Sequence, residues 1–201
     1  MNSPLLYPNF VENNLHEIQK GIGYSRKQFT EDDIRIEKNE NGTETYIYDP
    51  YNPLNRQITE LEIQDILKRY GINYQIHNYN LYRRAFIHKS YTRTPNLENM
   101  TRPNVVFMDK PSNCLPLSTK SNERIEFVGD GILECITKYY LYRRFPKENE
   151  GFMTEKKIAL VKNEAIGRIA YEMGLHKWFI LSRHAEEKQT RTNLKKLGCL
   201  F

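Results

Sequence analysis

The stretch SNERIEFVGDGILECITKYYLYRRF, residues 121–145, decides the fold of this 201-residue chain. Its apolar residues recur at spacings that predict one long helix. Four carboxylates stand on it at steps of three, four and four residues: Glu123, Glu126, Asp130 and Glu134. Because each residue turns an α-helix by about 100°, these four side chains fall within one narrow arc.

The acidic stripe indicates a metal site. The rest of the helix is so apolar that we expect it to bury most of its surface, and a carboxylate near a core loses hydration unless a cation or donor replaces it. Carboxylate oxygens suit Mg²⁺ or Mn²⁺. Glu126 and Asp130, one helical turn apart, could share an ion that activates water and offsets the charge of a phosphate. The alternative is an exposed amphipathic face that binds nothing.

The composition sets broad limits. Hydrophobic residues at 39% and charged residues at 27% are ordinary for a soluble globular protein, and a net charge of +5 is compatible with a polyanionic partner without requiring one. The three cysteines are odd in number, far apart and without zinc-ligand spacing, which favours a reduced intracellular compartment and no zinc site. The chain has neither a secretory leader nor an apolar run of about eighteen residues, so we expect no membrane span.

Residues 1–55 lack sustained periodicity and predict an N-terminal extension, in which residues 45–48 could form a short strand. The main body is expected over residues 56–201. The proline-containing stretch 91–120 predicts a long loop insertion, which either covers the acidic helix or is a surface feature of no consequence. Because strand signals are few, the predicted fold class is mainly α.

Three further helices are predicted, over residues 58–70, 81–90 and 154–174. Thr59 and Glu62 have the spacing of a capping box at the start of the first. We interpret His88, near the end of the second, as a structural histidine rather than a ligand.

Residues 122–130, NERIEFVGD, resemble the signature of the ribonuclease III family, N-E-R-L-E-F-L-G-D. The flanks agree in order, with AFIHKS before the signature and YLYRRFP, EGFMTEKKIALVKNE and RIAYEMGL after it. The resemblance covers about residues 58–201, interrupted at 91–120. It implies an all-helical endonuclease domain that forms a homodimer and cleaves double-stranded RNA with Mg²⁺ or Mn²⁺, using a metal-activated water.

The resemblance also implies roles for residues of the signature. Glu126 and Asp130 match family metal ligands. Glu123 matches the first acid of the signature, associated with catalysis and the dimer interface. Phe127 matches an aromatic residue that packs into the partner. Glu134 matches no family catalytic position, so we interpret it as an accessory acid.

Outside the signature, Glu150 matches an acid that assists catalysis across the dimer, and Asn163 matches an asparagine near the active helix. The family's remaining metal ligands come from a later motif, L-x-D-x-x-E-A. The stretch KKLGCLF, residues 195–201, aligns with its start, so Cys199 stands where Asp is expected and the chain stops one residue before the expected Glu. Cysteine is a poor Mg²⁺ ligand, and we expect these residues to be an amino-terminal fragment of a longer protein.

Three functions therefore stay open. The first is a ribonuclease III-type endoribonuclease in RNA processing or degradation. The second is a catalytically degenerate relative that keeps the fold for RNA binding or dimeric assembly, and the third is a helical interaction protein unrelated to RNA. The Asn-, Ile-, Lys- and Tyr-rich composition would suit an AT-rich genome such as that of a large DNA virus, so the expected location is cytoplasmic or the cytoplasm of a host cell.

Overall fold

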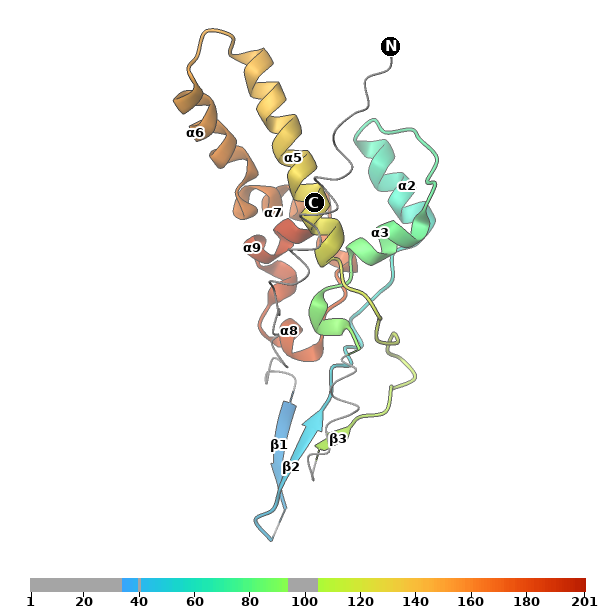
Figure 1. Ribbon diagram of the computed structural model, residues 1–201. Coiled ribbons are helices and arrows are strands. Elements are labelled where there is room, and N and C mark those ends of the chain that lie inside the picture. The colour runs from blue at the N-terminus through green and yellow to red at the C-terminus, as the bar shows by residue number, and fades with distance from the viewer. Residues whose placement is uncertain (1–33, 40, 94–104) are drawn as a thin grey trace, which may run out of the picture. The chain divides into compact units, whose positions relative to one another are not determined.

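The computed structural model describes residues 34–39, 41–93 and 105–201, all within one compact unit that covers residues 32–201. These residues form mainly helices, with one three-stranded sheet (Figure 1), so the predicted fold class is confirmed. None of the helices in the described ranges combines the length and the apolar character that a membrane span needs.

Helix α2 (Glu60–Arg69) begins with the predicted capping box. The Thr59 hydroxyl accepts a hydrogen bond from the Glu62 N–H at 3.2 Å, and the Glu62 carboxylate accepts one from the Thr59 N–H at 2.8 Å. Gly71 follows the helix with a φ of +79°, a left-handed conformation that glycine adopts without steric cost. The sequence alone therefore defines both ends of this helix.

Helix α3 (Tyr79–Ala85) starts two residues earlier than predicted and ends five residues before the predicted end at residue 90. The chain leaves the helix because Ile87 forms a bridge with Ile180, a residue distant in the sequence. A 3-10 helix, η2 (Lys89–Tyr91), follows.

Helix α5 (Glu123–Arg144) is the predicted long helix, and it packs side by side with α6 (Glu150–Val161) (Figure 1). The single helix predicted over 154–174 is wrong, because the structure has two helices there. Lys162 has an extended conformation with a ψ of 141°, which ends α6 and lets α7 (Asn163–Glu172) take a new direction.

The new direction brings α7 against α9 (Leu194–Leu197). A Cβ atom added to Gly167 would overlap the carbonyl group of Leu194, so the two backbones approach at a distance that only glycine permits. Gly174, with a φ of +78°, ends this region as predicted and leads into the 3-10 helix η3 (Leu175–Trp178). The remaining elements are α8 (Arg183–Glu187), η4 (Thr190–Thr192) and η5 (Gly198–Leu200).

The hydrophobic core lies among α2, α3, α7 and the elements from η3 to η5. Its buried members are Ile58, Ile63, Ile66, Ile76, Phe86, Ala170, Leu175, Trp178, Phe179, Leu181, Ala185, Leu197 and Leu200. Helix α5 contributes no residue to this cluster.

The expectation that α5 buries most of its surface is therefore wrong for a single chain. Within this helix only Thr137 and Leu141 are buried. The core is completed by other helices, and α5 contacts mainly α6 and η5. Six large apolar side chains of α5, here together called the α5 apolar face, stay exposed: Phe127 on the side of the carboxylates, and Val128, Ile132, Ile136, Tyr139 and Tyr140 on another side.

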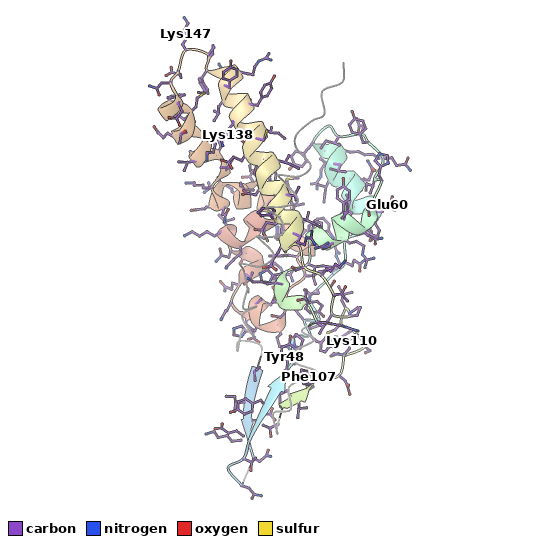
Figure 2. The ribbon with its side chains drawn as sticks, viewed as in Figure 1. Tyr48, Glu60, Phe107, Lys110, Lys138 and Lys147 are labelled. Carbon is purple, nitrogen blue, oxygen red and sulfur yellow. The ribbon has the colours of Figure 1, made fainter. Side chains whose placement is uncertain are left out.

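The sheet has the order β1-β2-β3, made of β1 (Ile34–Lys38), β2 (Glu44–Tyr48) and β3 (Val105–Phe107). Strands β1 and β2 are antiparallel, whereas β2 and β3 are parallel. The rings of Tyr48 and Phe107 meet edge to face across β2 and β3, with centroids 5.8 Å apart (Figure 2). The predicted strand at 45–48 is confirmed as β2, and β1 and β3 were not predicted.

The sheet joins two segments that the sequence analysis treated separately. Strands β1 and β2 belong to the predicted extension, and β3 belongs to the predicted insertion. Residues 1–33 and 40 of the extension and 94–104 of the insertion lie outside the described residues.

The segment just before α2 is bonded into the helical body. The Asn52 and Asn55 side chains, both buried, donate hydrogen bonds to the Leu181 carbonyl at 3.3 and 2.8 Å. Arg191 donates to the Asn55 side chain at 3.2 Å and forms an ion pair with Glu186 at 2.6 Å. The domain boundary at residues 55 and 56 stays a prediction.

Candidate functional site

A cavity of about 500 Å³ opens along the first three turns of α5. Its other walls come from the start of α7 and from η5, with Ala85 of α3 at one side. Six of the residues that the sequence singled out line this cavity: Glu123, Glu126, Phe127, Asp130, Asn163 and Cys199. The described parts of the insertion, residues 91–93 and 105–120, contribute nothing to the lining.

The start of α5 is held in place by hydrogen bonds to residues at and just after the end of α3. The Asn122 N–H donates to the Ile87 carbonyl at 2.8 Å, and the Arg84 Nε donates to the Ser121 carbonyl at 2.8 Å. The Asn122 side chain is buried and does not cap α5. It donates instead to the carbonyl oxygen and Sγ of Cys199, at 3.4 and 3.5 Å. These bonds fix the first carboxylate turn relative to η5.

The carboxylates repel one another in this cavity. Burial raises the pKa of Glu126, and the nearby charges of Glu123 and Asp130 raise it further. The opposing influence is Lys89, whose Nζ lies 3.6 Å from the Glu123 carboxylate. Sequence reasoning missed Lys89 as part of the site, because no periodic pattern connects it to a helix that begins more than thirty residues later.

Cys199 supplies no charge to the cavity. Burial raises the pKa of its thiol to about 11, so the sulfur stays protonated at neutral pH. Its position depends on Gly198, because a Cβ at Gly198 would lie 3.0 Å from the Asn163 carbonyl oxygen. A protonated thiol is a poor ligand for a hard cation.

The donor set fits a hard divalent cation in part. Glu126 and Asp130 present oxygen ligands from adjacent turns of one wall, in a cavity with excess negative charge. Mg²⁺ usually keeps several waters and takes one or two carboxylates from the protein. Within the described ranges, no cluster of three or more His, Cys, Asp or Glu side chains forms a complete metal cage.

Two predicted acids stand outside the cavity. Glu134 forms ion pairs with Lys138 and Lys157 at 3.0 Å each, and these lysines lower its pKa. It therefore links α5 to α6. Glu150, the first residue of α6, is exposed and accepts a hydrogen bond from the Thr154 hydroxyl at 2.9 Å.

The structure agrees with the interpretation of His88 as a structural residue. Its Nδ1 accepts a hydrogen bond from the Ser90 N–H at 3.2 Å, and its ring packs edge-on against Phe179. Burial lowers the pKa of this imidazole to about 4. The ring is thus neutral at physiological pH and outside the cavity lining.

Comparison with known proteins supports the class of fold. The nuclease domain of ribonuclease III from Campylobacter jejuni has a similar structure, with a TM-score of 0.51 and 22% sequence identity over 70% of this chain and 75% of that one. Another structure of the same domain is described for structural flexibility in a region involved in dimer formation.

The sequence comparisons name the same family. Residues 123–198 match the ribonuclease III domain. Ribonuclease 3 of Enterococcus faecalis is 31% identical over 147 residues, which cover 73% of this chain and 53% of that protein. A probable ribonuclease 3 of Acanthamoeba polyphaga mimivirus is 27% identical over 82% of this chain and 31% of that protein. These matches identify a ribonuclease III domain over residues 123–198 of the chain, and the chain spans from about a third to about half of the length of these relatives.

Proposed function

We propose that this chain contributes the catalytic domain of an endoribonuclease that cleaves double-stranded RNA with a divalent metal ion. The observation that carries the proposal is the group of three carboxylates, Glu123, Glu126 and Asp130, in one cavity of a ribonuclease III-like fold. Relatives named ribonuclease 3 support the reaction class.

In this proposal Glu126 and Asp130 would hold Mg²⁺ or Mn²⁺ by their carboxylate oxygens. The metal would supply a water with a lowered pKa and would offset charge on the phosphate. Glu123 orients groups at the cavity mouth, and the Asn163 amide lines the opposite wall, where it can donate to a phosphate oxygen. The bond that breaks is a phosphodiester, and the product carries a 5′-phosphate.

We further propose that the chain acts as a homodimer through the α5 apolar face. Exposed apolar side chains in this number usually mark an interaction site. The dimer region described for the Campylobacter jejuni domain favours a second copy as the partner. In such a dimer Phe127 packs into the partner, and Glu150 would act toward the partner's cavity rather than its own.

Cleavage of a labelled RNA duplex in Mg²⁺ tests the enzymatic proposal. The Asp130→Asn variant should cut at least about a hundredfold more slowly, because it loses a ligand charge. Glu134→Gln is the matched control, since Glu134 also loses one charge on α5 but lies outside the cavity. Equal cleavage by wild type and Asp130→Asn would contradict the assignment of this cavity.

Cys199 favours a second candidate function. A neutral thiol in the cavity leaves the metal with few protein ligands, which suits a degenerate module that binds RNA or assembles without cutting. Duplex binding without cleavage over a range of Mg²⁺ and Mn²⁺ concentrations would support this candidate. Cleavage that Asp130→Asn abolishes would exclude it.

A further inference from the structure

Lys89 lies beside the cavity, because its ammonium group is 3.6 Å from the carboxylate of Glu123, which lines it, and its backbone is hydrogen-bonded on both sides. On one side, the His88 N–H donates to the Ile180 carbonyl at 3.0 Å. On the other, the Thr92 hydroxyl donates to the Lys89 carbonyl at 2.7 Å. Ile87, which precedes His88, accepts a hydrogen bond through its carbonyl oxygen from the Asn122 N–H at the start of α5. The backbone that carries the Lys89 ammonium is thus fixed relative to the acidic helix.

The ammonium itself is loosely held. Its partner Glu123 lies 3.6 Å away, and the two side chains are 63% and 57% exposed. An exposed pair of this kind contributes little to the stability of the fold. Lys89 can therefore leave Glu123 at small cost when a stronger anion arrives.

A cation is needed at the rim of this cavity for an RNA substrate. The carboxylates of Glu123, Glu126 and Asp130 repel a phosphate group. This repulsion is felt at the cavity rim even when an ion is held deeper in the cavity. Lys196, on α9, acts electrostatically on both His88 and Cys199, so a second ammonium lies on the same side of the molecule. Lys89 is nearer to the carboxylates, because it forms a direct ion pair with one of them.

We propose that Lys89 is a positioning residue that binds a backbone phosphate of duplex RNA at the rim of the carboxylate cavity. This inference rests on the proposed function. The ammonium moves from the Glu123 carboxylate to the phosphate, forming a charge-assisted hydrogen bond. The move also releases the Glu123 carboxylate toward the cavity. Lys89 thus sets where the duplex backbone lies relative to Glu126 and Asp130.

The test is binding of a fluorescent RNA duplex to the full chain in metal-free buffer over a range of salt concentrations. Lys89→Met should weaken binding about tenfold at low salt, because a hydrogen bond to a charged group is lost. It should also make the slope of log affinity against log salt shallower by about one. Lys89→Arg keeps the charge and should restore most of both. Lys147→Met, in the exposed turn between α5 and α6, is the matched control and should change neither (Figure 2).

Two results separate this inference from simpler explanations. If Lys89 only held Glu123 in place, Glu123→Gln would weaken binding as Lys89→Met does. The phosphate contact predicts instead that Glu123→Gln binds duplex at least as tightly as wild type. If Lys89→Met binds the duplex as tightly as wild type and with the same salt slope, the inference about Lys89 is overturned while the proposed function stands. No duplex binding by the wild-type chain would instead overturn the proposed function.

Discussion

Replacing Phe127 with alanine tests whether the α5 apolar face is a dimer interface. Phe127 is 81% exposed in the single chain, the most exposed of the large hydrophobic side chains on α5. A phenylalanine buries roughly 150–250 Å² when covered, so a partner would remove roughly 120–200 Å² of this side chain from water. At about 25 cal/mol per Å², that is about 3–5 kcal/mol per protomer.

Alanine keeps part of this area, so the loss on truncation is about 2–3 kcal/mol per protomer. A two-fold dimer loses the contribution twice. The dimer dissociation constant should then rise by roughly three to four orders of magnitude, since each 1.4 kcal/mol is tenfold. Analytical ultracentrifugation over a wide concentration range measures this constant.

Leu61→Ala is the matched control. Leu61 is 77% exposed but lies on α2, away from the α5 apolar face. It should leave the dissociation constant unchanged, and both variants should keep the unfolding midpoint of the monomer. A wild-type chain that stays monomeric at high concentration, or a Phe127→Ala dimer as tight as wild type, would refute the reasoning.

Three more predictions concern stability and the metal site. Gly167→Ala should destabilise the fold by about 1–3 kcal/mol or more in urea denaturation, because the new methyl group overlaps the Leu194 carbonyl. Gly131→Ala is the control, and it should be neutral or slightly stabilising because the space around Gly131 is open. His88 is neutral in the fold, with a pKa near 4 against 6.5 for a free imidazole, so its protonation in the unfolded chain should remove about 2 kcal/mol of stability between pH 7 and pH 5. His88→Asn should flatten the plot of unfolding free energy against pH between pH 7 and pH 5. An unchanged plot would contradict the assignment of this pH dependence to His88. Cys199→Asp adds a carboxylate to the cavity and should tighten Mn²⁺ binding roughly tenfold or more, as measured by titration calorimetry. Unchanged Mn²⁺ affinity would show that residue 199 does not face the metal.

The sequence was informative where the signals are local. The capping box at Thr59, the stop at Gly174 and the carboxylate spacing on α5 each depend on residues within one or two helical turns. The helix break at Lys162 was missed because lysine is a good helix former, and only packing of α7 against α9 explains the change of direction.

The part of the candidate site that lies within one helix was also predicted from local signals. Glu126 and Asp130 share one helix, and the signature resemblance added Cys199 and Asn163 from distant segments. Lys89 was missed because its ion pair with Glu123 forms across a long insertion. The burial of α5 was misjudged because an apolar helix face does not reveal whether its partner is the same chain or another one.

The parallel pairing of β2 with β3 makes the extension and the insertion one appendage rather than two. Deleting the insertion alone would expose the backbone N–H and C=O groups along the outer side of β2, and an open strand edge invites aggregation. Deleting the extension alone would leave β3 without its neighbour. Gain or loss of this appendage in related chains should therefore involve both segments together, although nearly sixty residues separate them in the sequence.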